Sequence, residues 1–496
     1  MSEIRGIILV ILGVSALVFY YRWWFMEERL TSPWLVVGFI VALFYGGIQL
    51  MGNWLMYLAT HYSSKASLQP VDNLSVDVFV TACGEEHALI ERALLACCAM
   101  RGQHKTWLLD DGHDPVLARL AEQLGVGYLT RQERKHAKAG NINAALARTN
   151  GDIVVIFDID HAPKPNFLER SLSHFADPEI GFVQVMLTFE NDQDGWVAQA
   201  AAETSYDFYN PTSIGADGVK SATLIGTNAL IRREALNSIG GYQPGLAEDL
   251  ETSIALHAAG WRSAYVSEPL APGYAPPDLA AWFTQQFKWA RGVFESLLTA
   301  YPRYFSRLRS GQRLFYPVRM TYYWVGLITC IHLWVTLIAL LGGNSNFLAA
   351  FQQYLIHFLP LSGMALIIRI LALRRWRHWS LRNNLQGNPI ALVYATWPIY
   401  TLAWFMALLR IPLGFRPTPK THTGSLNVVW LAPQFVSFLF LIFGLLYHLF
   451  SYGGPLYLLV LAFACAQAVP QVLFFRHCLP GKVVVSRIKP MMTTSP

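Results

Sequence analysis

The stretch that decides the fold reads Asp152-Ile153-Val154-Val155-Ile156-Phe157-Asp158-Ile159-Asp160-His161. Its first six residues are mostly β-branched or aromatic and predict a buried strand. Asp158 and Asp160 follow directly and point the same way if the strand continues. Alone, the pair also fits an ordinary loop turn. If both carboxylates are ionised at a buried edge, a positive group must neutralise them, and a divalent cation that holds a diphosphate would do so.

The composition divides the chain into a soluble part and a membrane part. Of the 496 residues, 53% are hydrophobic and only 14% are charged, whereas average domains carry about 25% charged residues. Most acidic residues lie between Asp72 and Glu295. We therefore expect one soluble domain between two membrane-embedded blocks. The net charge of +6 reflects basic residues beside hydrophobic stretches, as the positive-inside rule predicts, so we expect no nucleic-acid partner.

A membrane span requires about 20 mostly apolar residues, and six stretches meet this requirement. They are 5–25, 34–58, 318–342, 348–373, 427–449 and 455–475. A seventh stretch, 389–411, contains Pro389 and Pro398 among aromatic and polar groups. If this stretch lies along the interface, the basic clusters around Arg375 and Lys482 both fall on the cytosolic side. We therefore expect six spans and an interfacial stretch at 389–411.

The six cysteines indicate the compartment that the soluble domain faces. None of them forms a C-x-x-C pair, and two lie inside apolar stretches. The pattern predicts neither a disulfide framework nor a zinc site, so we expect the soluble domain to face the reducing cytosol.

Strands and helices alternate between about residues 74 and 275. The residue patterns predict strands at 76–81, 106–109 and 152–157, and helices at 86–100, 114–124 and 141–149. Such alternation predicts βαβ units with a mostly parallel sheet, in which ligands bind outside the carboxyl ends of the strands. Acidic residues gather at these ends: Glu85, Asp110, Asp111, Asp158 and Asp160. We expect a binding site there.

Three further motifs have both a structural and a functional interpretation. Lys138-Ala139-Gly140-Asn141 precedes a predicted helix and is either a simple cap or part of a phosphate site. Glu248-Asp249 opens a helix whose dipole favours acids there, and the same position suits a general base. The stretch 285–292 is either an amphipathic interface helix or a site with a cation for a leaving diphosphate and a tryptophan for a sugar ring.

These motifs occur in the order of a known signature. Asp110-Asp111-Gly112, Asp158-Ile159-Asp160, Glu248-Asp249 and Gln285-x-x-Lys288-Trp289 resemble the D, D-x-D, T-E-D, Q-x-x-R-W signature of processive family 2 glycosyltransferases. Cellulose synthase catalytic subunits belong to this family.

Two further segments support the resemblance. Ile225-Gly226-Thr227-Asn228-Ala229 matches the family, and Phe415-Arg416-Pro417-Thr418-Pro419-Lys420 is similar to the F-x-V-T-x-K gating loop of cellulose synthases. Together the matches cover about residues 70–425. They imply a GT-A-type α/β domain with a mostly parallel sheet, inserted between helical transmembrane segments.

With the hydrophobic pattern, the resemblance predicts seven regions. They are two N-terminal transmembrane helices (1–60), a cytosolic GT-A domain (70–275), amphipathic interfacial helices (276–317), a transmembrane hairpin (318–373), an interfacial helix with the gating loop (374–426), a second hairpin (427–476) and a cytosolic tail (477–496). The predicted location is the plasma membrane, which is the inner membrane in a bacterium.

The resemblance also implies roles for individual residues. Contacts to a UDP-sugar would come from Glu85, Asp110, Asp111, Lys138, Asp158, Lys288, Thr418 and Lys420. Asp158 and Asp160 would hold Mg²⁺ or Mn²⁺ on the diphosphate. In the catalytic pair Glu248-Asp249, Asp249 would take the proton from the acceptor hydroxyl, so that an α-linked donor gives a β-glycoside. Contacts to the acceptor would come from Trp289, Gln285 and Asn228.

Three positions depart from the family signature. Ala247 replaces the threonine before the two acids, and Pro417 replaces the valine of the gating loop. Lys288 stands where arginine is usual, and lysine keeps the charge but loses the planar two-pronged donor. Arg291, one helical turn further on, is a candidate to compensate.

The matches predict a synthase that polymerises a UDP-sugar, UDP-glucose by resemblance, into a β-linked polysaccharide and extrudes it through its own channel. Its partners would be the UDP-sugar donor, the growing glycan, the lipid bilayer and export subunits of the cell envelope. One alternative is a synthase that uses UDP-GlcNAc or UDP-GlcA, and another is the transfer of a single sugar to a membrane lipid. The remaining alternative is a transporter or scaffold with an inactive domain, against which the intact acids argue.

Overall fold

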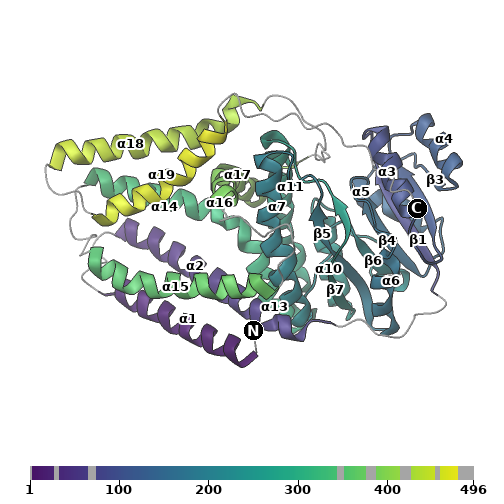
Figure 1. Ribbon diagram of the computed structural model, residues 1–496, viewed down its shortest axis with the longest axis horizontal. Helices are drawn as coiled ribbons and strands as arrows, with labels where there is room; N and C mark the ends of the chain where they lie inside the picture. The colour runs from purple at the N-terminus through teal and green to yellow at the C-terminus, as the bar shows by residue number, and fades with distance from the viewer. Residues whose placement is uncertain are drawn as a thin grey trace.

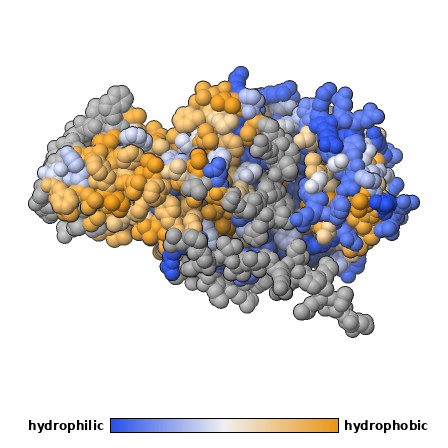
Figure 2. Space-filling view, turned by 90° about the horizontal axis from the view of Figure 1, so that it is seen from above, coloured by the Kyte–Doolittle hydropathy of each residue, from blue (hydrophilic) through white to orange (hydrophobic). Residues whose placement is uncertain are grey.

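The computed structural model describes residues 3–26, 33–64, 74–342, 351–375, 387–413, 426–452 and 458–478. The molecule extends from a block of long helices at one end to an α/β domain at the other (Figure 1). Hydrophobic side chains predominate on the visible surface of the helical block, whereas hydrophilic side chains predominate on that of the α/β domain (Figure 2). The soluble part and the membrane part predicted from the composition are therefore distinct in space.

A seven-stranded sheet forms the centre of the α/β domain. Its strands are β1 (Val76–Ala82), β2 (Lys105–Asp110), β3 (Gly127–Leu129), β4 (Ile153–Asp158), β5 (Ile180–Phe189), β6 (Ala229–Arg232) and β7 (Arg262–Gly273). Their order across the sheet is β3-β2-β1-β4-β6-β5-β7. Only β6 runs antiparallel to its neighbours, β4 and β5, and the other pairs are parallel. The predicted mostly parallel sheet is confirmed.

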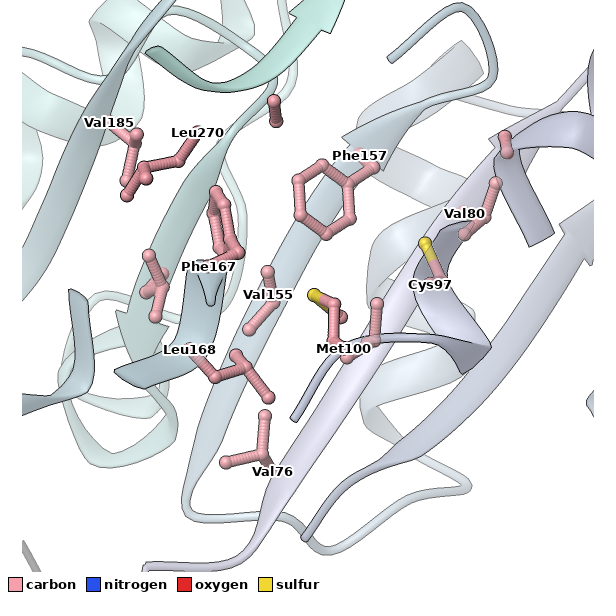
Figure 3. Packing of buried hydrophobic residues seen from close by; sticks show 14 of the residues in the cluster. Val76, Val80, Cys97, Met100, Val155, Phe157, Phe167, Leu168, Val185 and Leu270 are labelled. Atoms are coloured by element: carbon pink, nitrogen blue, oxygen red, sulfur yellow. The ribbon is translucent and has the colours of Figure 1, made fainter. Parts of the chain in front are cut away.

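Helices cover both faces of the sheet. The helices of this domain are α3 (His87–Cys98), α4 (Pro115–Leu124), α5 (Ala137–Leu146), α6 (Phe167–Ser171), α7 (Trp196–Asp207), α8 (Ser213–Gly218), α9 (Arg233–Ser238) and α10 (Glu248–Ala258). Val78 and Val80 of β1 belong to a core shared with α3, α4 and α6, in which Phe157 packs against Phe167 (Figure 3). Phe79 belongs to a second core with α5, α9 and α10. The central strands are buried on both sides, as parallel strands require.

The predicted strands coincide with β1, β2 and β4 to within a residue, and two predicted helices coincide with α3 and α4 to within two residues. The third helix was predicted at 141–149, and this start is wrong, because α5 begins at Ala137. Lys138 therefore lies in the first turn of α5 rather than before it. Gly140 permits this early start, since a Cβ there would lie 2.0 Å from the carbonyl oxygen of Lys135.

The helical block contains the predicted membrane segments. Its long helices are α1 (Glu3–Trp24), α2 (Pro33–Ala59), α14 (Val325–Gly342), α15 (Phe351–Arg375), α18 (Ala432–Tyr452) and α19 (Leu458–Cys478). Within the described residues, five helical runs are long and apolar enough to cross a membrane: Glu3–Trp24, Val37–Tyr62, Ser310–Leu341, Gln353–Leu373 and Val429–Ser451. These runs overlap five of the predicted spans. The sixth predicted span corresponds to α19, which carries the buried polar residues Gln467 and Gln471, and its crossing stays a prediction.

The connection from the sheet to α14 is also helical. It consists of α11 (Leu279–Leu298), α12 (Ala300–Tyr304) and α13 (Ser310–Met320). We expected interfacial helices to end at 317 and a separate span to begin at 318. Instead, α13 continues through a 3₁₀ turn (Thr321–Trp324) into α14, so one apolar helical run begins at Ser310.

The stretch 389–411 forms two helices, α16 (Gly387–Ala395) and α17 (Trp397–Leu408), which meet at Thr396 with a bend of 42°. Together they are long and apolar enough for a broken span or a re-entrant loop. The hydroxyl of Thr396 accepts a hydrogen bond of 2.9 Å from the indole of Trp282 on α11. This hydrogen bond links the bend to α11. The predicted interfacial position of this stretch stays a prediction.

Candidate active site

A cavity of about 910 Å³ opens at the carboxyl ends of β1 and β4. It continues past α7, α10 and α11 to side chains of α2, α14, α15 and α16. Most of the predicted site residues line this one space: Glu85, Asp111, Lys138, Asp158, Asp160, Glu248, Asp249, Gln285, Lys288 and Trp289. The cavity thus joins the strand ends of the α/β domain to the helical block.

Lys138 neutralises the first acid of the Asp-x-Asp pair. Its ammonium group forms an ion pair with Asp158 and donates to the carbonyl oxygen of Gly226 at 2.7 Å. Burial opposes a charge on Lys138, but the carboxylates of Asp158, Glu248 and Asp249 outweigh burial and raise its pKa. The first turn of α5 therefore brings a firmly protonated ammonium group to the strand ends.

Asp160, the second acid of the pair, is 1% exposed, and its Oδ1 lies 3.5 Å from Nδ1 of His161. In the part of the chain that the structure describes, no cluster of three or more His, Cys, Asp or Glu side chains is arranged to hold a metal by itself. A Mg²⁺ site does not need such a cluster, because this ion takes one or two protein carboxylates together with substrate phosphates and water. Asp158 and Asp160 thus fit a divalent cation that binds together with a diphosphate.

Asp249 lies at the tip of α10, where the helix dipole favours acidic side chains. Burial and the adjacent charge of Glu248 raise the pKa of Asp249 to about 7. Gly226, with φ +85°, separates this carboxylate from Lys138: a Cβ there would lie 3.4 Å from Oδ2 of Asp249 and 3.9 Å from Nζ of Lys138. Asp249 can accept a proton near neutral pH in a space that the glycine keeps open.

Close packing brings α11 against the start of α10. A Cβ on Gly292 would lie 2.8 Å from the backbone nitrogen of Ala247. About one helical turn earlier, Lys288 and Trp289 line the same cavity as Asp249. Burial lowers the pKa of Lys288, although the acids of the cavity oppose this effect. One cation and one indole of α11 therefore share the cavity with the tip of α10.

The two acids after β2 lie in different environments. Asp111 lines the cavity and accepts two hydrogen bonds from Arg131, each of 2.7 Å. Asp110 is fully buried, and its carboxylate accepts from the backbone of Gly112 at 2.6 Å and from the hydroxyl of Tyr128 at 2.8 Å. Asp110 organises the loop and does not line the cavity, so its contact with a nucleotide stays a prediction.

Glu85 lies on the loop after β1, and its Oε2 accepts from the backbone N–H of Cys83 at 2.6 Å. Burial raises the pKa of Glu85. Around the strand ends and the tip of α10, six carboxylates line the cavity against three cations, which are Arg134, Lys138 and Lys288. This end is therefore acidic and needs further positive charge before it can hold a diphosphate.

Known proteins are similar to this chain in sequence. Residues 153–368 match the family described as glycosyl transferase family group 2. The matched part of the chain contains Asp158, Asp249 and Trp289. The UDP-forming cellulose synthase catalytic subunit of Pseudomonas fluorescens is 29% identical over 71% of this chain and 50% of its own length. That of Xanthomonas axonopodis pv. citri is 31% identical over 65% of this chain and 47% of its own length. The chain thus spans about half the length of these curated relatives.

The fold of the glycosyltransferase domain also occurs in a solved structure. A mannosyltransferase from Pyrobaculum calidifontis, in complex with GDP-Man and Mn²⁺, superposes with a TM-score of 0.53 at 17% identity. The likeness covers 76% of this chain and 99% of that one. It supports the GT-A-type fold that the sequence predicts.

Some predicted residues of the glycosyltransferase site lie elsewhere. Asn228 is fully buried and donates to the carbonyl oxygen of Ala271 at 2.9 Å. It does not line the cavity, so its acceptor contact finds no support in this geometry. Thr418 and Lys420 of the gating loop lie outside the described residues.

Arg291 does not compensate for the lysine at position 288. Its guanidinium donates to Glu295 at 2.8 Å and to the carbonyl oxygen of Ile411 at 3.0 Å, and it does not line the cavity. Arg291 follows Lys288 by about one helical turn, which made it a candidate. Its side chain, however, extends from α11 toward the end of α17.

Sequence reasoning missed several residues of the glycosyltransferase site. Arg131, which binds Asp111, lies in a loop with no motif to signal it. The hydroxyl of Thr227 accepts from the backbone N–H of Asp158 at 3.0 Å. Thr227 stands in the segment 225–229 that matched the family, so that match was the available signal. The charged residues on the membrane side of the cavity carried no motif signal at all.

Proposed function

We propose that this protein is a membrane-embedded inverting glycosyltransferase that polymerises a UDP-sugar, UDP-glucose foremost, into a β-linked polysaccharide. The observation that carries the proposal is the single cavity, in which the Asp-x-Asp acids, Asp249 and Trp289 face a space that continues among apolar helices. Similarity to UDP-forming cellulose synthase catalytic subunits supports both the donor and the repeated transfer.

Asp249 acts as the general base. With its pKa at about 7, about half of the molecules carry an ionised Asp249 that can accept a proton at neutral pH. It takes the proton of the acceptor hydroxyl while that oxygen attacks the anomeric carbon of the donor. The bond from that carbon to the diphosphate breaks on the opposite side, and its electron pair leaves with UDP. The product is a β-glycoside formed with inversion.

The donor lies at the strand ends. Asp158 and Asp160 would hold a divalent cation, Mg²⁺ or Mn²⁺, which neutralises the negative charge of the diphosphate when bound. Lys138 fixes Asp158 through their ion pair, and Lys288 adds positive charge toward the leaving diphosphate. Glu85 and Asp111 contact the uridine, as the family resemblance implies.

The acceptor lies between Trp289 and Asp249. The face of the indole provides a flat apolar surface for a sugar ring, and Gln285 lies one turn away on α11. After each transfer the glycan moves along the cavity toward α14, α15 and α16. We further propose that the glycan is extruded across a bacterial inner membrane and that the catalytic domain faces the cytosol. Export subunits of the cell envelope would be its partners.

The test uses the purified full chain in lipid vesicles with radiolabelled UDP-glucose and Mg²⁺ or Mn²⁺. Wild type is compared with Asp249→Asn and with Asp194→Asn, the same substitution at an exposed position outside the cavity. Wild type and Asp194→Asn are expected to build a high-molecular-weight, β-glucanase-sensitive product. Asp249→Asn should make it about 10²- to 10⁴-fold more slowly, because general base catalysis is worth that much.

Other outcomes separate the parts of this proposal. Label confined to an organic-soluble lipid would contradict polymerisation and favour transfer of a single sugar. A polymer formed from UDP-GlcNAc or UDP-GlcA, but not from UDP-glucose, would replace the donor and leave the reaction type standing. No incorporation from any of the three donors would contradict the enzyme itself.

A further inference from the structure

The cavity does not end at the catalytic residues. On its membrane side it is lined by α7, α13 and α15, which contribute four charged side chains: Glu203, Asp207, Arg319 and Arg369. Arg369 lies within the apolar run Gln353–Leu373. A charge in such a helix is costly unless it is paired and faces protein or a water-filled space, and it marks a functional site by default. The proposed chemistry at Asp249 uses none of the four.

Arg369 is paired with Asp207, the last residue of α7. Nη2 of Arg369 donates to Oδ2 of Asp207, and the pair joins α15 to the glycosyltransferase domain. The two side chains remain 40% and 31% exposed, and both line the cavity. The pair therefore faces the space of the cavity and is not sealed inside packed protein.

Aromatic side chains surround the pair. Tyr57 of α2 and Tyr322, in the turn between α13 and α14, line the same part of the cavity. Both phenol groups are close enough to Asp207 and Arg369 to interact electrostatically with these two charges. This combination suits a sugar, because a ring face packs on an aromatic face while hydroxyl groups reach neighbouring polar groups.

Negative and positive side chains are equal in number on the membrane side of the cavity. Two carboxylates face two guanidinium groups, and Arg319 lies over the ring of Phe208 at 4.8 Å. An anionic ligand would need a cation that is not already compensated. Among the described residues lining this part of the cavity, the positive charges do not outnumber the negative ones. The balance disfavours a lipid phosphate or a uronate and suits a neutral ligand.

We propose that the Asp207–Arg369 pair, with Tyr57 and Tyr322, is a binding subsite for an uncharged glycan, the growing acceptor of the proposed reaction. A sugar hydroxyl both donates and accepts a hydrogen bond. Neighbouring hydroxyls can therefore donate to the carboxylate of Asp207 and accept from the guanidinium of Arg369 at once. The subsite rests on the proposed function for its ligand, and it extends acceptor binding beyond Trp289.

The test measures binding of cellopentaose, a neutral oligosaccharide, to the full chain in lipid nanodiscs by calorimetry. Asp207→Asn and Arg369→Gln should each weaken the affinity about tenfold or more, because each removes a charge-assisted hydrogen bond. Arg170→Gln is the matched control, since Arg170 forms the same kind of pair with Glu268 on the exposed surface of the domain. This control should bind as wild type does. UDP binding in the same samples shows whether each variant is folded.

The double variant Asp207→Asn, Arg369→Gln separates binding from structure. It leaves no unpaired charge, so a purely structural pair predicts that the double variant recovers wild-type affinity. The proposed subsite predicts that the double variant stays at least about as weak as the single ones. Recovery of affinity would overturn the proposal.

Anionic probes test the alternative that the subsite binds a charged ligand. A hyaluronan hexasaccharide or a short polyprenyl phosphate should bind wild type more weakly than cellopentaose. Tighter binding of either probe, lost in Arg369→Gln, would overturn the neutral subsite. Polymer synthesis from UDP-glucose with unaltered cellopentaose binding in the variants would refute the subsite alone. Weakened binding in the variants without any synthesis from UDP-glucose would refute the proposed donor and support the subsite.

Discussion

Two adjacent carboxylates at the start of α10 set the pH at which the site can work. Burial and the charge of Glu248 raise the pKa of Asp249 to about 7. Only the ionised form can take a proton from the acceptor, so the rate should rise with pH through about 7 and level off above that value. The acidic limb of the pH profile therefore reports the state of Asp249.

Glu248→Gln should move that limb to lower pH. Loss of the neighbouring negative charge makes ionisation of Asp249 easier and lowers its pKa. The measurement is kcat/KM for polymer synthesis between about pH 5 and 9. Glu251→Gln, a control in the same helical turn, should leave the limb in place. An unchanged limb in Glu248→Gln would argue against Asp249 as the base.

Lys138→Met should weaken donor binding. The substitution keeps an unbranched chain but removes the ammonium group that pairs with Asp158 and donates to Gly226. Asp158 is only half-buried, but without its partner its carboxylate becomes harder to ionise and to position, so KM for UDP-glucose should rise about tenfold or more. Lys135→Met, at an exposed pair with Glu133, should leave KM unchanged. Equal KM values for the two variants would contradict the role of Lys138.

Motif spacing predicted the acids that face the cavity and failed where a loop decides the direction of a side chain. Asp158, Asp160 and Asp249 follow from a strand end and a helix start, whose geometry is regular. Asp110 turns into the loop because Tyr128, from a different strand, reaches its carboxylate. Contacts of this kind between distant segments leave no pattern in the sequence.

At the scale of elements, the catalytic geometry depends on how closely α11 approaches α10. Gly292 permits the contact, because any larger side chain would meet the backbone of Ala247. Gly292→Ala should push the helices apart, cost about 1–3 kcal/mol of stability and move Lys288 and Trp289 away from Asp249. We expect polymer synthesis to fall about tenfold or more even where the protein still folds.

Gly363→Ala is the control for that substitution. Gly363 also lies inside a helix, α15, but a Cβ there would meet nothing within 4 Å. The alanine should be tolerated there, since alanine favours helix by up to about 1 kcal/mol over glycine. Equal activity of Gly292→Ala and Gly363→Ala would show that the α10–α11 contact does not position the site.

Elements with a strong local pattern could be predicted from the sequence, and those made by distant contacts could not. β1, β2 and β4 are continuous apolar runs with turn residues at their ends, so their positions followed directly. β6 is four residues long, and its antiparallel place between β4 and β5 depends on pairing with strands far away in the chain. The bend at Thr396 likewise depends on Trp282 of another helix.

At the scale of the whole molecule, the cavity connects the α/β domain with the helical block. Hydropathy predicted where the apolar helices lie, because it depends only on composition. It could not predict which side of each helix faces the cavity, since that follows from packing between helices. Thr329 of α14 lines the cavity, whereas Ile338 on the same helix is 44% exposed on the outer surface.

These two positions give a test of the continuous cavity. In a background in which Cys83, Cys98, Cys330, Cys465 and Cys478 are replaced by alanine, Thr329→Cys should react with a water-soluble methanethiosulfonate, because a thiol in a hydrated cavity can ionise. Ile338→Cys should react at least about tenfold more slowly, since a lipid-facing thiol stays protonated. Modification at Thr329→Cys should also stop polymer synthesis by blocking the path of the glycan. Equal reaction rates at the two positions would show that the cavity does not carry water to α14 and would remove the route proposed for the product.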